Sequence, residues 1–101
     1  MTDRYLETVA CFKEEVALIT KNSDNWTEFL KTAANNYKYN FPDQILIYSQ
    51  RPYATACAEI GFWNDKMGRW ENRGIHGIAL LNYSGPSRVR YVFDISDTHS
   101  R

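Results

Sequence analysis

Aromatic rings, cationic side chains and amides alternate through the chain from about residue 48 onward. Single-stranded nucleic acid needs flat rings on which bases stack and cations that follow the phosphates, and this mixture supplies both. Each ring taken alone is more often a core residue than a stacking platform, so the pattern permits binding without proving it. The candidate nucleic-acid-binding residues are Tyr48, Gln50, Arg51, Tyr53, Lys66, Arg69, Trp70, Arg73, Arg88 and Arg90.

The three tryptophans have different surroundings in the sequence. Most aromatic rings pack in the core, and we expect Trp26 and Trp63 there. Trp70 stands between Arg69 and Glu71 in a polar, glycine-rich stretch, and we expect its ring to be exposed. Trp70 is therefore the best single candidate for base stacking.

Catalytic and metal-binding patterns are missing from the sequence. The histidines and cysteines have no CxxC, HxxxH or HExxH spacing, which argues against a zinc site. Ser96, Asp97 and His99 are residue types of a catalytic triad, but near neighbours at a strand end cannot converge as a triad must. Glu14 and Glu15 point about 100° apart on a helix, so they form no carboxylate pair. We expect no metal, no cofactor and no enzymatic activity.

Composition and charge set the remaining limits. The 101 residues, 44% hydrophobic and 24% charged, are typical of one globular domain. Twelve basic and twelve acidic residues balance, so net charge does not favour nucleic acid. Residues 1–40 carry five basic and six acidic side chains, whereas residues 51–101 carry seven and five, so an anion is expected to bind the second half. Two distant cysteines and no apolar run near 20 residues predict a cytoplasmic protein without disulfides or a membrane span.

The elements that position the candidate residues can be predicted from periodicity and caps. Apolar residues recur at helical spacing over 3–21 and 25–36, and Asn40 with Pro42 starts a helix over 42–50 that ends before Pro52. The alanine-rich stretch 54–60 predicts a fourth helix ending at Gly61.

Strands follow the helices in the sequence. Residues 64–68 resemble a turn, and the glycines of Gly74–Gly77 are interpreted as preparing the start of a strand. Strands over 78–83 and 88–95 flank a four-residue loop, which predicts a hairpin. The expected fold class is α+β, with about four N-terminal helices followed by a small antiparallel β-hairpin or sheet.

Several short motifs also follow one another in a characteristic order. They are Asn25-Trp26, Tyr39-Asn40, Gln50-x-Pro52-x-Ala54-Thr55, Trp63, Gly68-Arg69, Gly74-x-x-Gly77-Ile78 and Phe93-Asp94-Ile95-Ser96-x-Thr98. Together they resemble the N-terminal domain of ArdC-like antirestriction proteins and the related LtrC-like primase-associated proteins, over about residues 24–98. One departure is Arg73 before Gly74, where the family commonly has lysine, and this keeps the positive charge.

The resemblance implies a sequence-independent single-stranded DNA-binding module of a conjugative plasmid or transposon. It implies a single domain over residues 1–101, with the helix at about 3–21 accessory to it, at the front of a larger protein. The family's peptidase, primase, helicase or methyltransferase modules would then lie after Arg101, because residues 1–101 contain neither HExxH nor a P-loop.

Two functions from different classes follow from the sequence. The first is binding of single-stranded DNA, favoured by the clustered arginines and the resemblance. The second is a protein-interaction domain that docks a host enzyme or downstream modules of the same polypeptide, and the balanced net charge favours it.

Overall fold

A computed structural model describes residues 3–82 and 84–100 of the chain. Over these residues the chain forms four α-helices and five short β-strands. In chain order they are α1 (Arg4–Ile19), α2 (Ser23–Asn35), α3 (Phe41–Gln50), β1 (Cys57–Ala58), α4 (Ile60–Met67), β2 (Arg69–Glu71), β3 (Ile78–Leu81), β4 (Val89–Asp94), a 3-10 turn η1 (Ile95–Asp97) and β5 (Thr98–Ser100). The predicted α+β class is confirmed, with β1 placed before the last helix.

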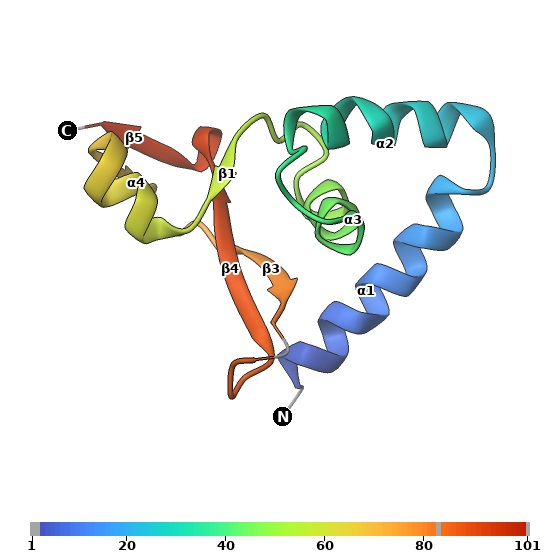
Figure 1. The fold of residues 1–101 in the computed structure, drawn as a ribbon, viewed down its shortest axis with the longest axis horizontal. Helices are drawn as coiled ribbons and strands as arrows, with labels where there is room; N and C mark the ends of the chain where they lie inside the picture. Colours follow the sequence, from blue (N-terminus) through green and yellow to red (C-terminus); the bar gives the residue numbers. More distant parts are fainter. Residues whose placement is uncertain (1–2, 83, 101) are drawn as a thin grey trace.

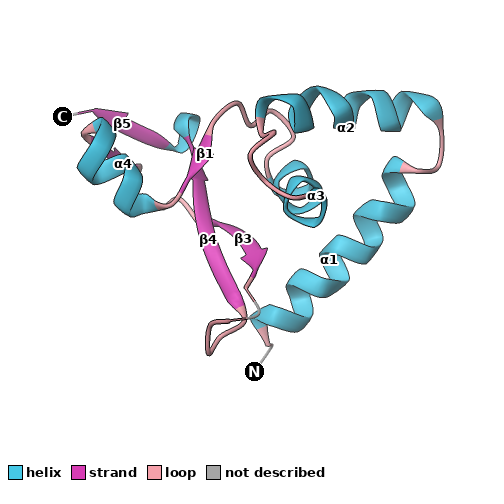
Figure 2. Cartoon of the chain, in the orientation of Figure 1, coloured by secondary structure: helices cyan, strands magenta, loops and turns pink. Residues whose placement is uncertain are grey.

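The helices and strands form two parts that meet along β4. α1 and α2 enclose α3, and this group covers one side of the sheet of β3 and β4 (Figure 1). α4 and the two-stranded sheet of β2 and β5 lie at the opposite end of β4 (Figure 2). The segment after α3, from residue 51, and the segment after β4, from residue 95, therefore lie together between these two parts.

A side-chain cap begins each of the first three helices. The side chains of Asp3, Asn22 and Asn40 accept hydrogen bonds from the backbone N–H groups of Tyr5, Asn25 and Asp43, at 2.9, 2.8 and 2.9 Å. A capping acceptor satisfies a backbone donor that the helix itself leaves unpaired. The predicted helices over 3–21, 25–36 and 42–50 are confirmed, with bounds that differ by at most two residues.

Two small antiparallel sheets hold the second half of the chain. β4 is central in the first sheet, whose order is β1-β4-β3, and β2 pairs with β5 in the second. β3 and β4 form the predicted hairpin, with Ile78 opposite Val92 and Leu81 opposite Val89. The predicted first strand extended to Tyr83, which lies outside the described residues.

The core has two adjoining apolar clusters. One joins Leu46 and Ile47 of α3 to Ile78, Leu80 and Val92 of the hairpin. The other joins Ile19, Phe29 and Ile45 at the meeting of the first three helices. Phe12 of α1 packs against both clusters, so α1 is part of the core.

The predicted helix over 54–60 is wrong. The backbone N–H groups of Thr55 and Ala56 donate to the Asp94 carboxylate at 2.8 and 3.0 Å, and Cys57 and Ala58 pair with β4. These tertiary partners outweigh the helical propensity of alanine, which is only a fraction of a kcal/mol per residue. The fourth helix, α4, begins only at Ile60.

The predicted turn over 64–68 is also wrong, because α4 continues to Met67. Gly68, at φ +60°, ends the helix in the left-handed conformation that glycine adopts without strain. Gly61, predicted as a helix end, is the second residue of α4 instead.

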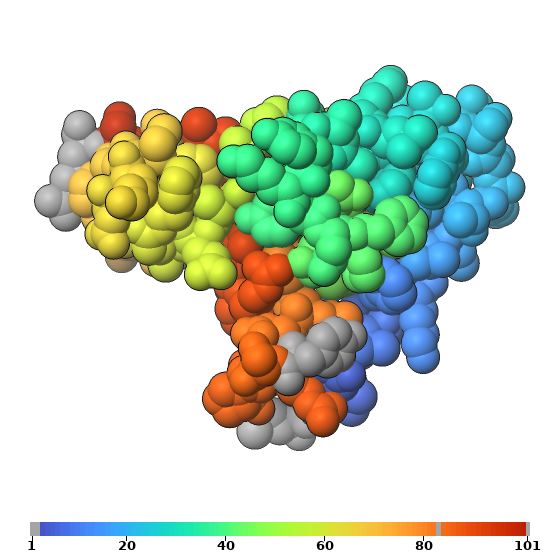
Figure 3. All heavy atoms as spheres, viewed as in Figure 1, coloured from blue at the N-terminus to red at the C-terminus, as the bar shows by residue number. Residues whose placement is uncertain are grey.

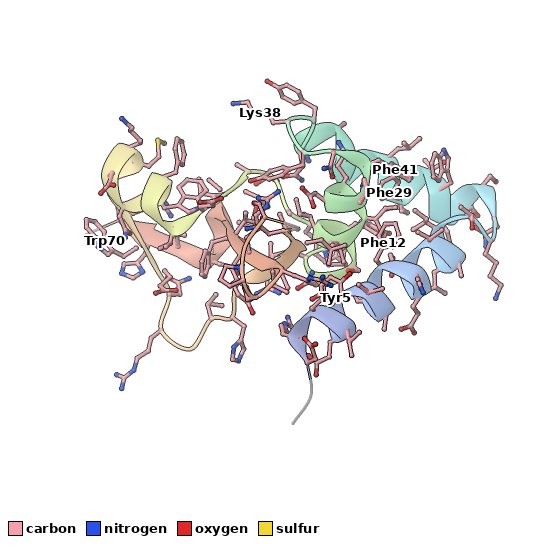
Figure 4. The ribbon with its side chains drawn as sticks, turned by 60° about the horizontal axis from the view of Figure 1, so that its bottom comes forward. Tyr5, Phe12, Phe29, Lys38, Phe41 and Trp70 are labelled. Atoms are coloured by element: carbon pink, nitrogen blue, oxygen red, sulfur yellow. The ribbon has the colours of Figure 1, made fainter. Side chains whose placement is uncertain are left out.

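Two of the three tryptophan predictions need correction. Trp63 is buried, at 3% exposure, and its indole donates to the Phe93 carbonyl at 2.8 Å, as expected for the core. Trp26 was expected in the core but is 37% exposed, because it lies at the outer edge of the Phe29 and Phe41 rings. Trp70 was expected to be exposed but is half-buried, since it lies in β2 opposite His99. Figure 4 shows Trp70 beside α4, at the end of the molecule away from α1, α2 and α3.

Candidate nucleic-acid interface

Residues from four parts of the chain line one hollow of about 780 Å³ beside β4. We call it the arginine hollow. The start of α1, the end of α3, the segment after β2 and the outer face of β4 contribute to it. Its lining residues are Arg4, Gln50, Arg51, Glu71, Ile75, His76, Gly77, Tyr91 and Phe93. Two of the segments selected from the sequence, residues 50–53 and 68–74, therefore meet here at Gln50, Arg51 and Glu71.

Gln50 closes the free edge of the hairpin. β3 is an edge strand, so the outward N–H and C=O of Ala79 have no strand partner. The Gln50 side chain supplies both bonds, donating to the Ala79 carbonyl and accepting from its N–H, each at 2.9 Å. The amide thus acts as one residue of a missing strand, and most of its hydrogen-bonding capacity is occupied.

Arg51 joins three segments through its guanidinium. Its Nε donates to Asp97 at 2.9 Å, and its two terminal nitrogens donate to the carbonyls of Gln50 at 2.9 Å and His76 at 3.0 Å. A guanidinium has five N–H donors, and these bonds engage three of them. Arg51 therefore holds the segment with His76 against the end of α3, where it forms one wall of the arginine hollow.

The floor of the hollow consists of rings on the outer face of β4. Tyr91 is 44% exposed, and Phe93 lies two residues further along the same face. Gly77 lies so close to this face that a Cβ there would come 2.9 Å from the Cβ of Tyr91. Because Gly77 has no side chain, the segment with His76 can lie directly against Tyr91 of β4.

The charges around the hollow nearly cancel. Arg4 is bonded to Glu7 at 3.1 Å, and the pKa of its guanidinium is raised by that hydrogen bond first and also by Tyr91. Arg51 faces Asp97, and Glu71 adds a further carboxylate to the lining. The Arg4–Glu7 pair is exposed, and such pairs contribute about 0–1 kcal/mol, so an incoming phosphate can compete for Arg4 at little cost. Asp97 is buried, so Arg51 stays paired with it and offers a phosphate only its remaining N–H donors.

Three other predicted residues are held in internal contacts. Arg69 donates to the hydroxyl and carbonyl of Thr98 at 2.8 and 2.9 Å, which joins β2 to β5. Arg90 pairs with Asp43 at 2.6 Å and lies over the Tyr39 ring. Burial raises the pKa of Asp43, although Arg90 opposes the shift. Tyr48 packs edge-on against Phe29 between the helices.

The remaining predicted residues lie at the surface in separate places. Tyr53 is 90% exposed on the loop after α3, and Lys66 is exposed in the last turn of α4. Arg73 is exposed in the segment that forms the wall of the hollow, and Arg88 is exposed at the hairpin. The predicted set therefore does not form a single surface, and only Gln50 and Arg51 line the arginine hollow itself.

Asp94 fixes the corner at which β1, β4 and η1 meet. One carboxylate oxygen accepts from the N–H groups of Thr55 and Ala56, and the other from the N–H and hydroxyl of Ser96 at 3.1 and 2.5 Å. Burial alone would raise the pKa of Asp94, but the bonds from Ser96, Ala56 and Thr55 outweigh it and lower the pKa. These bonds hold the backbone at the start of η1, whose last residue, Asp97, pairs with Arg51.

Sequence reasoning missed Arg4, His76, Tyr91 and Phe93. The alternation of residues 88–95 places Tyr91 and Phe93 on the strand face opposite Arg88 and Arg90, and only the arginine face supplied candidate residues. The signal that could have found them is Gly77, since a glycine next to a strand often marks a close approach of another backbone. Arg4 had no such signal, because its place depends on how α1 packs.

A second surface is apolar. Trp26 and Leu30 on α2 and Phe41 at the start of α3 are 37%, 45% and 49% exposed. The rings of Trp26 and Phe41 lie 6.5 Å apart, and Figure 4 shows Phe41 beside Phe29 on this side of the helices. We call these three residues the α2–α3 apolar patch.

Three comparisons with known proteins were made for the whole chain. No protein-family model, curated protein or solved structure matches it. The structure also holds, within residues 3–82 and 84–100, no cluster of three His, Cys, Asp or Glu side chains suited to a metal ion. None of the helices in that part of the chain is long and apolar enough to cross a membrane.

Proposed function

We propose that this domain binds single-stranded DNA without base preference, and that the arginine hollow is its binding site. The observation that carries the proposal is the lining of the hollow: two guanidiniums and an imidazole surround the exposed Tyr91 ring. Rings accept any base by stacking, and cations accept any phosphate. The site thus has the chemistry for binding a strand and no dense set of hydrogen-bonding groups for reading its sequence.

The charge balance sets the strength of this binding. Because the arginines of the hollow already face carboxylates, few phosphates gain a full cation. With about three phosphates neutralised, a slope of roughly −0.7 per contact gives a log–log salt dependence near −2. Binding is expected to be weak at physiological salt and to strengthen clearly at low salt.

Titration of a fluorescent oligothymidine, followed by anisotropy at several salt concentrations, tests the proposal. Tyr91→Leu removes the stacking ring and is expected to cost about 1–3 kcal/mol of binding, while Tyr91→Phe keeps the ring and most of the affinity. Tyr37→Leu is the matched control, since Tyr37 is also exposed, at 74%, but lies outside the hollow. Binding that ignores salt, or equal losses for Tyr91→Leu and Tyr37→Leu, would contradict the proposal.

The resemblance to ArdC-like and LtrC-like domains supports a particular setting for this activity. In that setting the domain protects or positions single strands transferred by a mobile element, in the cytoplasm and next to enzyme modules of the same protein. The domain then acts by binding and catalyses no reaction of its own. Expression of the full-length protein in a recipient cell, with transfer of restricted and unrestricted plasmids compared, tests this setting.

A protein-interaction function is the second candidate, and the α2–α3 apolar patch favours it. Exposed apolar patches rimmed by polar residues commonly mark protein-binding surfaces. Leu30→Ser, in the middle of the patch, should leave DNA binding unchanged if DNA binds at the arginine hollow. If Leu30→Ser abolishes association with the other modules of the full-length protein, the patch binds protein.

A further inference from the structure

Arg88 is an exposed cation whose side chain lies over an aromatic ring. Its guanidinium carbon lies 5.1 Å from the centre of the Tyr5 ring, within the range of a cation–π contact. The ion pairs within residues 3–82 and 84–100 involve Arg4, Lys31, Arg51 and Arg90, and none of them involves Arg88. A ring holds the guanidinium in place without neutralising it, so the full charge stays available to an anion.

The backbone at Arg88 is also unusual. Its φ is +60°, and it is the one residue other than glycine with a positive φ in the described part of the chain. Arginine seldom adopts this conformation, which costs about 1 kcal/mol or more, and such residues are enriched at functional sites. Glycine would adopt this positive φ without strain, so the turn of the hairpin does not by itself require arginine at position 88.

The first turn of α1 connects Arg88 to the arginine hollow. Tyr5 lies under the Arg88 guanidinium, and the preceding residue, Arg4, lines the hollow. Figure 3 shows the orange hairpin residues beside the blue start of α1, and Figure 4 shows Tyr5 in that turn next to the hairpin. Arg88 and Tyr5 do not line the hollow themselves, but they lie at the turn of α1 that contributes Arg4 to it.

We infer that Arg88 and Tyr5 form a preformed phosphate subsite that extends the arginine hollow along β4. The inference rests on the proposed function, because its ligand is a backbone phosphate of the bound strand. A side chain already held in place saves the ordering cost that a mobile arginine pays on binding. The first turn of α1 is thereby part of the interface, whereas the rest of α1 is not.

The length of β4 gives the extent of the bound strand. β4 has six residues, which span about 20 Å at roughly 3.3 Å per residue. A stacked strand advances about 3.4 Å per nucleotide, so about six nucleotides follow β4 from Arg88 to the end near Arg51. Affinity for oligothymidines should therefore rise with length up to about six nucleotides.

The substitution Arg88→Gly separates binding from stability. It removes the cation and at the same time relieves the positive φ, so the melting temperature should change little. One lost contact lowers affinity by about fivefold at 0.1 M salt and about 25-fold at 0.01 M, because each contact contributes roughly 0.7 to the slope.

Arg88→Lys keeps the charge and should keep most of the affinity, and Tyr5→Leu should weaken binding by less than Arg88→Gly. Lys13→Gln, an exposed cation further along α1, is the matched control and should bind like the wild type.

The outcomes separate this inference from the proposed function. Wild-type binding with a fivefold loss in Arg88→Gly, and none in Lys13→Gln, supports the subsite. Wild-type binding that is unchanged in Arg88→Gly overturns the subsite and leaves the proposed function standing. Loss of folding stability in Arg88→Gly, with affinity per folded molecule unchanged, overturns it as well and assigns Arg88 a structural role. Absence of binding by the wild type refutes the proposed function and this inference together.

Discussion

Asp94→Asn is the substitution whose effect on stability follows most directly from the structure. Asp94 is 2% exposed and each carboxylate oxygen accepts two N–H or O–H hydrogen bonds, with a longer contact from the Cys57 thiol at 3.9 Å. Asparagine has nearly the same shape but replaces one oxygen with an NH2 group. With that group toward Thr55 and Ala56, two N–H donors face a donor. With that group toward Ser96, the Ser96 N–H faces a donor, while the Ser96 hydroxyl can turn to accept.

The lower limit comes from the one backbone bond that is lost in either orientation. A hydrogen bond to a charged group contributes about 1.5–3 kcal/mol, so the loss should be at least about 1.5 kcal/mol. A domain of this size is stable by about 5–15 kcal/mol, and 1 kcal/mol shifts its melting temperature by about 4–8 °C. Asp94→Asn should therefore lower the melting temperature by at least about 6 °C.

Urea unfolding at pH 7, followed by tryptophan fluorescence and by circular dichroism, measures this loss. Asp65→Asn is the matched control, because Asp65 is an exposed residue of α4, and its effect should stay within about 0.5 kcal/mol. A loss below about 1 kcal/mol for Asp94→Asn would refute the reasoning. The bonds at the corner would then contribute no more than ordinary surface contacts.

Three further predictions concern the same part of the molecule. Because the pKa of Asp94 is lowered in the folded state, its carboxylate stabilises the fold fully above the unfolded pKa of about 3.9, and this stabilisation is lost as the pH falls further. The difference in unfolding free energy between wild type and Asp94→Asn should therefore shrink between about pH 5 and pH 2 in unfolding experiments. Gly77→Ala should destabilise the domain by about 1–3 kcal/mol because its Cβ would meet Tyr91, whereas Gly61→Ala, with open space in α4, should stabilise it by about 0.4–1 kcal/mol; equal melting temperatures would contradict this. Burial, followed by the charge of Asp94, raises the pKa of the Cys57 thiol to about 12, so at pH 8 alkylation detected by mass spectrometry should be about a thousandfold slower than for a free thiol of pKa about 8.5.

Local signals predicted the helical half of the fold well. Asn40 caps the helix that it was expected to start, because a side-chain acceptor and the first turn are neighbours in sequence. The second helix was expected to start at Asn25, but Asn22 caps it instead. The hairpin of β3 and β4 was predictable for a similar reason, since alternation and loop length are local properties.

The segment 54–60 could not be predicted in the same way. Its alanines favour a helix, but its backbone donors are taken by Asp94, about 40 residues later in the chain. Only the folded chain brings this carboxylate to Thr55. The alanines therefore take an extended path, and the helix begins later, at Ile60.

The candidate site was predicted in part. The density of cations and amides around Gln50–Arg51 selected one side of the arginine hollow, because composition is visible in the sequence. The roles of those two residues were not visible, since the partners of Gln50 and Arg51 are Ala79 and Asp97. Tyr91, the ring at the floor of the hollow, lies on the strand face opposite the arginines, and that face supplied no candidate residue.

The central claim is that single-stranded DNA binds in the arginine hollow, and backbone amide shifts of the isotope-labelled domain on adding an oligothymidine of eight nucleotides test it most directly. The account predicts the largest shift changes at Arg4, Arg51, His76 and Tyr91, growing as salt is lowered. Shift changes confined to the α2–α3 apolar patch, or no changes at low salt, would contradict it.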